Sequence, residues 1–517
     1  MKGVGDADLR HEVHQGRVVR CFAERPRSLA GCLAAAVACT PDAEAVVDGQ
    51  RRLSYAGLNE AVHTLAAALA SQGLARGDRV AILLANRLEY QVIVLACALG
   101  GWIAVPLNIR HTPSEIAQAL IACGAAALFH EADAPLPDLP AAVKLRFAVA
   151  DDVALPSAPP RAFAPVDEDD PAVILFTSGT TGRPKGAVLT HCNLVHSVLH
   201  YRHHYSLREG ERCLLAVPAS HVTGLVALLS VSVAMAGCLI IMREFKAARF
   251  LEVAVREGMT YTLIVPAMIA LLLMDPHFDG RTLRKWRICG FGGAPMPVST
   301  IAQLNAALPG LALHNTYGAT ETTSPAVIMP ATEAAGRSDQ LGLPVACCDL
   351  LVMDAQGHEL PPGEQGEIWM AGPMVSPGYW NDPDATAAEF VHGFWKSGDV
   401  GSRDAQGYVA LHDRLKDMIN RGGFKVWSVE VENALCSHPA VIEAAVVGKP
   451  CPVLGEHVVG FVNLRQTVTA DELRQHLAPL LSDYKVPDEL HVAAAPLPRN
   501  ANGKLLKRDL RERLAAS

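Results

Sequence analysis

One short segment of the 517-residue chain concentrates residue types that bind phosphate groups. It runs from Thr177 to Gly186 and reads TSGTTGRPKG. Its hydroxyl groups can donate hydrogen bonds to phosphate oxygens, Lys185 adds a positive charge, and glycines let the backbone approach a ligand closely. A plain surface turn would not need this combination, so the segment predicts a cradle for a triphosphate. The residues expected to form it are Thr177, Ser178, Gly179, Thr180, Thr181, Gly182 and Lys185.

The spacing of this segment differs from that of a Walker A loop. A Walker A loop has Gly-x4-Gly-Lys followed by Ser or Thr, and it leads into a helix. Here Lys185 is followed by Gly186 and then by AVLTH, which is typical of a strand. A second strand, AVILF at 172–176, precedes the segment. We therefore expect a hairpin-like loop between two strands, a different way of holding phosphate.

Six further segments accompany the first one along the chain. They read PASHVTG from 218, GGAPMP from 292, YGATET from 317, WKSGD from 395, RLKDMINRGG from 414 and PRNANGK from 498. Together the seven segments resemble the signatures of the adenylate-forming superfamily, which contains acyl-CoA synthetases, peptide-synthetase adenylation domains and luciferases. One such motif would be weak, but seven in the right order extend the resemblance over nearly the whole chain.

The resemblance implies a two-step reaction with ATP, Mg²⁺ and CoA. A carboxylate and ATP first give acyl-AMP and pyrophosphate, and a thiol then displaces AMP. The first step joins two anions, so cations and hydrogen-bond donors must neutralise the phosphates. The resemblance assigns the β- and γ-phosphates to Lys185, the α-phosphate to Thr320 and the metal ion to Glu321, whose carboxylate suits a hard cation.

The resemblance also implies where the nucleoside is held. Adenine is expected against the 292–295 segment and the ring of Tyr317, since glycines permit close approach and an aromatic ring offers stacking area. A carboxylate offers two acceptor oxygens to a diol, so Asp399 is expected on the ribose hydroxyls, with Arg414 adding a third contact. The expected nucleotide-binding residues here are Gly292, Gly293, Ala294, Pro295, Asn315, Thr316, Tyr317, Gly318, Thr320, Asp399 and Arg414.

Four residues near the C-terminus complete the implied machinery. Lys504 resembles the catalytic lysine of the smaller domain and lies more than 300 residues from Lys185, so domain closure would be needed to bring both to one nucleotide. Lys416 occupies the position of the family's hinge, about which that domain rotates between the two half-reactions. Gly422 and Gly423 are expected to let the pantetheine arm of CoA pass.

The acid is the least determined substrate. His221 resembles a residue that gates the acyl pocket, although a lone histidine is more often structural. The run VPAMIALLLM at 265–274 is apolar, and 261–274 contains no arginine. A dicarboxylate would need a second cation there, because a buried unpaired carboxylate is very costly. We therefore expect a fatty or aryl monocarboxylate and leave its length open.

Other functions remain open at this point. An amino-acid-activating adenylation domain usually places an aspartate before the gate region, but 218–221 read PASH. A ligase that loads a separate carrier protein fits the motifs equally well. A non-catalytic nucleotide-binding protein would be expected to lack Lys504, Glu321 or Asp399, and all three are present. Nothing positive points to a luciferase-like oxygenase.

The elements that position these residues read as an α/β fold. Strands are expected at 79–84, 102–108 and 127–131, alternating with helices from Ser54, at 87–99 and from Thr112, where Glu115 completes a capping box. This repeated βαβ pattern predicts mostly parallel sheets. An irregular connection is expected over 132–171, where Pro and Ala are frequent.

The pattern changes near 413–416. Helices from Ser428 and Thr469, and strands near 441–447 and 457–464, predict a small, mobile α+β domain. The expected division is an N-terminal ATP- and acyl-binding domain over 1–413, a hinge at 414–417 and a C-terminal domain over 418–517.

Composition excludes several other classes. Half of the residues are hydrophobic and 19% are charged, which excludes a disordered chain. The net charge of 45 − 53 = −8 argues against nucleic-acid binding. The 13 cysteines lack zinc-ligand spacing and are expected to be reduced, inert core thiols of a cytoplasmic enzyme without a signal peptide. The uncharged stretch 225–242 is expected to be a buried helix and strand, not a membrane span. A homodimer is left open.

Overall fold

The computed structural model describes residues 8–151, 153–177, 184–294, 296–493, 495–499 and 505–516. It divides into two compact units. The first comprises Met1–Leu350, Met370–Lys396 and Gly407–Val409, and the second comprises Leu351–Trp369, Ser397–Gln406 and Ala410–Ser517. The predicted α/β class, with a large part built on mostly parallel sheets and a small C-terminal part, is confirmed. The boundary at 414–417 stays a prediction, since the compact units interleave along the chain.

The first unit contains a six-stranded sheet that ends in the predicted phosphate hairpin. β9 and β10 are antiparallel, and the remaining neighbours are parallel. β8 was missed by the sequence analysis, which expected an irregular connection there. The strand order is β10 (Lys185–Thr190), β9 (Pro171–Thr177), β6 (Ile103–Pro106), β5 (Arg79–Leu83), β7 (Ala127–Glu131) and β8 (Leu145–Val149).

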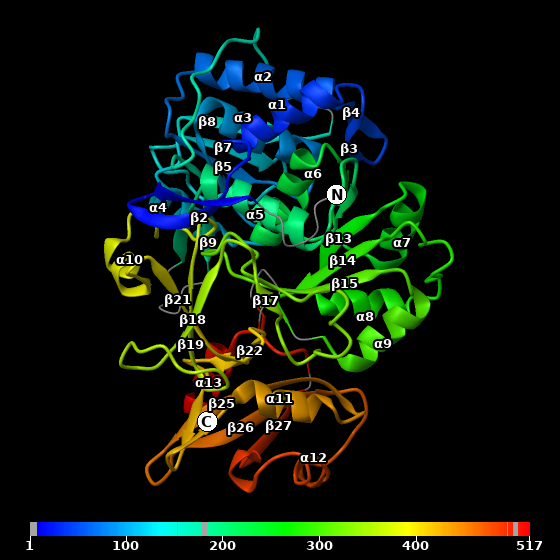
Figure 1. Cartoon of the computed structure of the whole chain (residues 1–517), viewed down its shortest axis with the longest axis vertical. Helices are drawn as coiled ribbons and strands as arrows, with labels where there is room; N and C mark the ends of the chain where they lie inside the picture. The colour runs from blue at the N-terminus through cyan, green and yellow to red at the C-terminus, as the bar shows by residue number, and fades with distance from the viewer. Residues whose placement is uncertain are drawn as a thin grey trace. The chain divides into compact units, whose positions relative to one another are not determined.

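Helices connect these strands as the sequence predicts. α2 (Tyr55–Ser71) begins at the N-cap Ser54, whose side chain accepts a hydrogen bond from the backbone of Gly57. α4 (Pro113–Cys123) begins with the capping box of Thr112 and Glu115. α1 (Leu29–Cys39), α2 and α3 (Leu88–Gly100) lie against one another, and Figure 1 shows them in blue.

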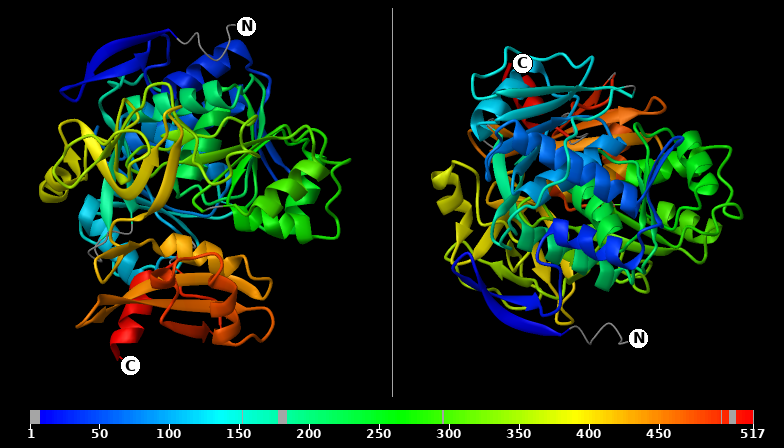
Figure 2. Two further views of the ribbon diagram at one scale, coloured as in Figure 1. Left: turned by 60° about the horizontal axis from the view of Figure 1, so that its bottom comes forward. Right: turned by 90° about the horizontal axis from the view of Figure 1, so that it is seen from above.

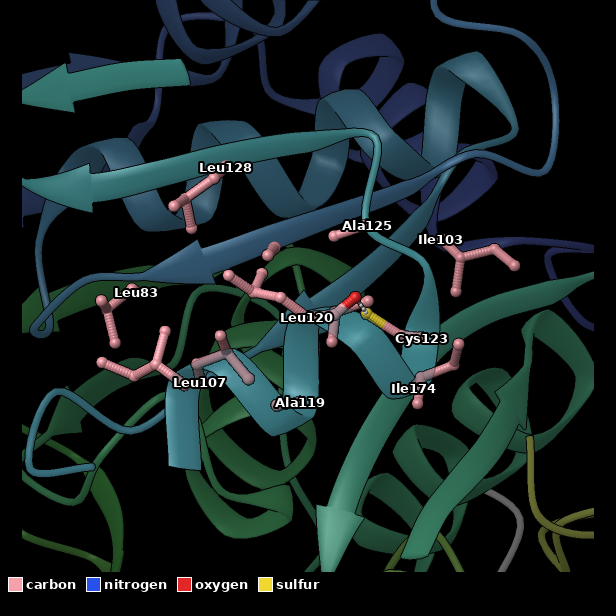
Figure 3. Close-up of a cluster of buried hydrophobic side chains, with 12 residues drawn as sticks. Leu83, Ile103, Leu107, Ala119, Leu120, Cys123, Ala125, Leu128 and Ile174 are labelled. Atoms are coloured by element: carbon pink, nitrogen blue, oxygen red, sulfur yellow. Dashed lines mark hydrogen bonds between the residues drawn. The ribbon is translucent and has the colours of Figure 1, made fainter. Parts of the chain in front are cut away.

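A dry apolar core fixes β9, the strand that leads into the phosphate loop. α4 buries Leu120 and Cys123 against the sheet, and Figure 3 shows them beside Leu107 and Ile174. The Sγ of Cys123 donates to the carbonyl of Leu120 over 3.7 Å. Ile174 belongs to β9, so burial of its side chain anchors the strand three residues before Thr177.

A nine-stranded sheet forms the rest of the first unit's framework. Its strands β3 and β11–β15 pair in parallel, while β4, β16 and β17 are antiparallel to their neighbours. Its order is β17 (Leu343–Pro344), β16 (Val327–Ile328), β15 (Ala312–Tyr317), β14 (Ile288–Gly292), β13 (Tyr261–Ile264), β11 (Arg212–Leu215), β12 (Cys238–Ile241), β3 (Glu44–Asp48) and β4 (Arg51–Ser54). The helices along this part of the chain are α5 (His191–His204), α7 (Ala247–Arg256), α8 (Pro266–Met274) and α9 (Val298–Ala307).

The uncharged stretch at 225–242 is internal, as expected. It contains a π-helix, η1 (Thr223–Ser230), then α6 (Val231–Ala234), and it ends in β12. Within the residues that the structure describes, no helix is both long and apolar enough to cross a membrane.

The start of the described chain is a β-hairpin that the sequence analysis did not predict. β1 (Leu9–His14) pairs antiparallel with β2 (Arg17–Phe22). Figure 2 shows this hairpin in dark blue next to the end marked N. All thirteen cysteines are free, but Cys39 and Cys436 are exposed and Cys451 is half-buried. The prediction that all thirteen are core thiols is therefore wrong for these three.

The second unit is built on two antiparallel arrangements. In the first, β19 lies between β18 and β21, and β22 pairs with β21. In the second, β26 pairs with β23 and β25 antiparallel and with β27 in parallel, and helices cover it. The bounds are β18 (Asp349–Met353), β19 (Gly366–Ala371), β21 (Phe394–Arg403), β22 (Val409–Arg414), β23 (Ile419–Arg421), β24 (Phe424–Val426), α11 (Ser428–Cys436), β25 (Val441–Cys451), β26 (Gly455–Leu464), α12 (Ala470–Leu477), β27 (Glu489–Ala493) and α13 (Lys507–Ala516).

The predicted starts of the helices in the second unit are confirmed. α11 begins at Ser428, and α12 begins after Thr469, which forms a capping box with Glu472. Val431 and Leu435 of α11 and Leu473 of α12 are buried in one apolar cluster with β25 and β26.

Candidate active site

The predicted phosphate loop lies between two antiparallel strands. Thr177 ends β9, Lys185 begins β10, and the two residues are paired across the hairpin. The Thr177 hydroxyl donates to the Lys185 carbonyl over 3.4 Å. The expectation of a hairpin instead of a Walker A loop is therefore confirmed. The predicted contacts Ser178, Gly179, Thr180, Thr181 and Gly182 lie outside the described residues.

Gly186, the residue after Lys185, is required by the packing around it. It is buried, and an added Cβ would lie 2.8 Å from Cγ2 of Ile174 and 3.3 Å from the ring of Phe176. Carbon atoms pack at about 3.5–4.0 Å, so a side chain would force these neighbours apart. Packing alone therefore explains the glycine at this position, and its backbone contact with a ligand stays a prediction.

The amine of Lys185 belongs to a connected set of polar groups, which we name the Lys185 cluster: Lys185, Glu321, Tyr379 and Glu389. Lys185 pairs with Glu389, at the end of α10 (Pro383–Glu389), and its Nζ lies 5.1 Å from the ring centre of Tyr379. The Tyr379 hydroxyl lies 2.9 Å from Oε1 of Glu321 and also contacts Glu389. One lysine, two carboxylates and a phenol therefore form a continuous chain of contacts.

The two carboxylates of the Lys185 cluster share the hydroxyl of Tyr379, and Glu389 also accepts from the Lys185 amine. The hydroxyl of Tyr379 carries one hydrogen, so it cannot donate fully to both Glu321 and Glu389. Burial, together with these two carboxylates, raises the pKa of Tyr379 far above its usual value and keeps it protonated. Glu321 itself is only 8% exposed. The two carboxylates, Glu321 and Glu389, offer hard oxygen atoms of the kind that a divalent cation such as Mg²⁺ prefers.

Sequence reasoning found Lys185 and Glu321 but missed Tyr379 and Glu389. Tyr379 lies 58 positions after Glu321, and Glu389 lies 204 positions after Lys185. No spacing rule relates residues so far apart, and the only local signal was the run SPGYW at 376–380.

The expected adenine segments are neighbours in the nine-stranded sheet. β14 and β15 are parallel and adjacent, with Gly292 opposite Thr316 at their carboxyl ends. A Cβ on Gly292 would lie 2.2 Å from the carbonyl oxygen of Thr316, so this position requires glycine. Gly293 has a φ of 79°, and Ala294 after it is exposed. Ligands of open α/β sheets bind beyond the carboxyl ends of their strands, which is where these residues lie.

The residues after β15 continue this edge. Tyr317 is half-buried and Gly318 is exposed, while the amide of Asn315 donates to the carbonyl of Gln340 over 3.2 Å. The hydroxyl of Thr316 instead contacts that of Tyr205 in the interior. Pro295, another residue expected to contact adenine, lies outside the described residues.

A tight turn presents Thr320 and Glu321. The backbone N–H of Thr323 donates to the Thr320 carbonyl over 2.9 Å, and Ala319 donates to the hydroxyl of Thr322 over 2.9 Å. Thr320 is half-buried, so its side chain retains contact with the surface, whereas Glu321 points inward to Tyr379. The turn thus directs the side chains of Thr320 and Glu321 to different places. This would let Thr320 bind the α-phosphate while Glu321 binds the metal ion.

His221 lies just before η1, in the connection after β11. Its Nδ1 is 3.2 Å from the hydroxyl of Thr223 and accepts from the Thr223 backbone over 3.3 Å. Gly224 is closely packed, since a Cβ there would lie 2.3 Å from the Pro218 carbonyl. π-helical turns are frequent at functional sites, so a histidine at the start of one is consistent with a role as a gate.

The apolar run at 265–274 forms α8, with one side buried and one side exposed. Ile269 and Leu272 are buried, whereas Leu271 is 51% and Met274 is 80% exposed. Only part of this run can therefore line a pocket.

In the second unit, β21 and β22 bring Asp399 and Arg414 together. Nε of Arg414 lies 2.9 Å from Oδ1 of Asp399. The backbone N–H of Asp399 donates to the Ser397 hydroxyl over 3.0 Å, and that of Leu415 donates to the Gly398 carbonyl over 2.8 Å. The predicted ribose pair is thus held by a strand and by the start of the expected hinge.

The expected hinge forms a turn that the C-terminal helix contacts. The backbone N–H groups of Asp417 and Met418 donate to the Arg414 carbonyl over 2.9 and 3.1 Å. From α13, Arg511 pairs with Asp417 over 2.7 Å and donates to the Lys416 carbonyl over 3.4 Å. Lys416 itself is exposed.

Gly422 and Gly423 form the two-residue turn between β23 and β24. Their φ values are 61° and 88°, and Arg421 pairs with Phe424 across them. Two consecutive positive φ values match a type I′ hairpin, which explains both glycines without a ligand. Their proposed contact with pantetheine stays a prediction. The catalytic residue expected in PRNANGK, Lys504, lies outside the described residues.

Comparison with known families agrees with this arrangement. The family of AMP-binding enzymes matches residues 33–380, and the AMP-binding enzyme C-terminal domain matches residues 430–504. The chain belongs to the AMP-binding enzymes. It is an ATP-dependent, AMP-forming acid–CoA ligase that works through an acyl-AMP intermediate and uses ATP, Mg²⁺ and CoA.

Individual relatives cover most of this ligase. Feruloyl-CoA synthase of an Amycolatopsis species is 35% identical over 478 residues, which cover 92% of this chain and 96% of that one. A fatty acid–(acyl-carrier-protein) ligase, ScoC of Streptomyces coeruleorubidus, is 34% identical over 496 residues, with 92% and 94% covered. The structure of o-succinylbenzoate-CoA synthetase from Bacillus subtilis with ATP and magnesium ion matches with a TM-score of 0.84 and 30% identity, covering 93% and 99%.

Proposed function

We propose that the Lys185 cluster holds the triphosphate and the metal ion during acyl-AMP formation. The observation that carries this proposal is the continuous contact from Lys185 through Glu389 and Tyr379 to Glu321. It connects the cation expected on the β- and γ-phosphates with the carboxylate expected on Mg²⁺. When bound, Mg²⁺ would supply positive charge to the phosphates.

In this proposal each group has a separate task before the carboxylate attacks. Phosphate oxygens replace Glu389 as the partner of Lys185, which places a positive charge beside the leaving pyrophosphate. Tyr379 keeps its proton and orients Glu321, because its raised pKa prevents ionisation. Thr320 donates to the α-phosphate, where negative charge accumulates in the transition state.

We assign the other nucleotide contacts on the same reasoning. Asp399 accepts hydrogen bonds from both ribose hydroxyls, and Arg414 contributes a further contact, supported by their pairing over 2.9 Å. The edge formed by β14 and β15 receives adenine. Lys504 stabilises the charge that develops as the carboxylate attacks, and Lys416 is the hinge.

For the acid, we propose a fatty or aryl monocarboxylate. The support is the apolar character of α8 and the lack of an arginine in 261–274. A second carboxylate would then have no cationic partner from this segment, which disfavours binding strongly. We propose that His221 gates the acyl pocket by the position of its ring, which the contact with the Thr223 hydroxyl fixes.

A panel of acids tests this proposal. Pyrophosphate release would be measured with octanoate, benzoate, malonate and succinate, each with ATP, Mg²⁺ and CoA. Octanoate- or benzoate-like acids should have a kcat/KM far above those of the two dicarboxylates. A dicarboxylate with the highest kcat/KM would refute the assignment.

A second candidate acceptor follows from one of the relatives, a fatty acid–(acyl-carrier-protein) ligase at 34% identity. In this alternative the acyl group passes to a carrier protein and not to free CoA. Both thiols carry a pantetheine arm, so the Gly422–Gly423 turn does not distinguish them. Single-turnover transfer from preformed acyl-AMP to CoA or to a phosphopantetheinylated carrier protein decides between the two.

We further propose that the enzyme is cytoplasmic, and a homodimer stays possible. Its thirteen free cysteines suit a reducing compartment, and both ATP and CoA are available there. Cell fractionation tests the location, and light scattering after gel filtration tests the dimer.

A further inference from the structure

Two cysteines, a histidine and an aspartate, none of them used above, converge at the N-terminal hairpin. His14 is the last residue of β1 and Cys21 lies on β2, while Cys192 is in the first turn of α5 and Asp169 precedes β9. One ligand atom each from His14, Asp169 and Cys192 lie within 4.8 Å of one another, and the same holds for His14, Cys21 and Glu12. The two groups share His14.

The strand register explains why these side chains meet. Alternate residues of a strand point to the same face, and cross-strand partners share that face. Arg10 pairs with Cys21, Glu12 with Val19, and His14 with Arg17. Glu12, His14 and Cys21 therefore lie on one face of the hairpin.

Direct contacts bring α5 and the Asp169 connection into the same group. Nδ1 of His14 is 2.9 Å from Oδ1 of Asp169, and the thiol of Cys21 contacts that of Cys192. Cys21 is 0% and Cys192 is 2% exposed, and the His14 side chain is 11% exposed. The Asp169 side chain is 33% exposed, so three buried donor groups meet one that solvent can reach.

Glu12 is less suitable than Asp169 as a ligand. Its two oxygens accept from the two Nη atoms of Arg25 over 2.9 and 2.8 Å, and the Arg25 side chain is fully buried. Arg25 also pairs with Glu168 over 2.7 Å. The charge of Glu12 is therefore already used within this network, whereas Asp169 contacts His14 and the backbone of Gln15.

We propose that His14, Cys21, Asp169 and Cys192 bind one zinc ion. Zinc prefers four ligands in a tetrahedron, and it combines thiolate, imidazole and carboxylate readily. Two thiolates and the Asp169 carboxylate would bring three negative charges to the two positive charges of Zn²⁺, so the occupied site would carry one negative charge, and Nη2 of Arg25 lies 3.4 Å from Nε2 of His14. Zinc motifs are recognised in a sequence by short spacings, and these ligands come from three distant segments, so spacing alone does not reveal such a site.

Such an ion would join the β1–β2 hairpin to α5, the helix that follows the predicted phosphate hairpin. α5 follows β10 directly, and β10 begins at Lys185. Zinc that binds the folded chain and not the unfolded chain raises stability by mass action. Its expected effect is on the stability of the first unit and not on the chemical step.

Cobalt substitution tests the site in the full chain. The protein would be purified with reductant, stripped with a chelator, and titrated with Co²⁺. We expect about one ion per chain, with the visible bands of tetrahedral cobalt and the ultraviolet charge-transfer band of a cobalt–thiolate bond, all removed by Zn²⁺. The Zn²⁺-loaded chain should also have a higher Tm than the stripped chain.

Matched variants decide whether these ligands are responsible. Cys192→Ser should lose the charge-transfer intensity and at least about tenfold in Zn²⁺ affinity, and Asp169→Asn should weaken binding while keeping the thiolate band. Cys39→Ser, which removes an exposed cysteine, should behave as the parent. Circular dichroism checks folding, and if Cys192→Ser misfolds, Asp169→Asn carries the test.

Three results would overturn the proposal. They are a parent chain that binds no Co²⁺, a spectrum that survives Cys192→Ser unchanged, or a Zn²⁺ affinity that Asp169→Asn leaves unaltered. A Cys21–Cys192 disulfide in protein kept under reductant, detected by mass as the loss of two hydrogens, would also exclude two thiolate ligands.

Discussion

The Lys185–Glu389 pair of the first unit and the Asp399–Arg414 pair of the second unit are prepared for ATP in opposite ways. In the first pair, the cation that the phosphates need is bound to a carboxylate, so phosphate must displace Glu389. In the second pair, the carboxylate that the ribose needs is bound to an arginine that is itself expected to contact the ribose. Under the proposed function, phosphate binding would exchange the partner of Lys185, whereas ribose binding would extend a pair that already exists.

Burial differs between the two pairs in a way that fits these roles. The Lys185 side chain is 14% exposed, so without phosphate its charge needs a nearby anion, and Glu389 supplies it. Arg414 is 41% exposed and Asp399 is 7% exposed. The buried member of the second pair is therefore the acceptor, which a strand and its hydrogen bonds keep in place.

The largest expected effect concerns Lys504. Neither of the two charge pairs is expected to stabilise the attacking carboxylate, and Lys504 is proposed to do so. Lys504→Ala should lose acyl-AMP formation by several orders of magnitude. The same variant should still convert supplied acyl-AMP and CoA to thioester. Separate assays of the two half-reactions check this, with Lys507→Ala as a control on the same segment. Equal loss of both steps would assign Lys504 to folding.

The next largest effect should come from fixing the hinge that follows Arg414. Proline holds φ near −65° and removes the N–H donor, so Lys416→Pro should restrict the turn. We expect acyl-AMP to form at a near-normal rate but to pass to CoA very slowly. Lys416→Ala removes only the charge and should impair the second step far less. Single-turnover kinetics measure both steps, and fast transfer by Lys416→Pro would place the hinge elsewhere.

Removing the carboxylate of the second pair should have an intermediate effect. Asp399→Ala deletes two acceptors, and hydrogen bonds to a charged group contribute about 1.5–3 kcal/mol each. ATP affinity measured by calorimetry should fall by at least about tenfold. Asp399→Asn keeps one acceptor and should lose less. If both variants bind ATP like the parent, the ribose assignment is wrong.

The sequence predicted the framework better than the contacts within it. Strong periodicity and capping residues, as at Thr112 and Glu115, determine local elements, and these predictions were confirmed. β8 and the N-terminal hairpin were missed because neither has a continuous apolar run: β1 reads LRHEVH and β8 reads LRFAV. Their pairing depends on partners elsewhere in the chain.

The same limit applies to the candidate site. Motif residues such as Lys185 and Glu321 are visible because each lies in a recognisable segment. Tyr379 and Glu389, which connect them, become neighbours only after folding. Gly186 shows a second limit, because its motif suggested ligand contact but did not reveal that Ile174 requires close packing there.

The smallest predicted effect tests whether Glu389 competes with phosphate. Glu389→Gln preserves shape but removes the charge that neutralises Lys185. A partly exposed ion pair contributes about 0.5–1 kcal/mol, so Lys185 should bind pyrophosphate about two- to fivefold more tightly in the variant when Mg²⁺ is absent. With Mg²⁺ present the gain should shrink, since the ion itself would draw Glu389 away from Lys185.

Two further variants make this test specific to the Lys185 cluster. Glu364→Gln removes an exposed carboxylate of the second unit and should leave pyrophosphate affinity unchanged. Lys185→Met combined with Glu389→Gln should abolish the gain, because the gain requires the freed amine. Calorimetric titration of all variants with and without Mg²⁺ provides the comparison. If Glu389→Gln instead weakens pyrophosphate binding without Mg²⁺, Glu389 orients Lys185 toward phosphate, and both charge pairs would then be prepared for ATP in the same way.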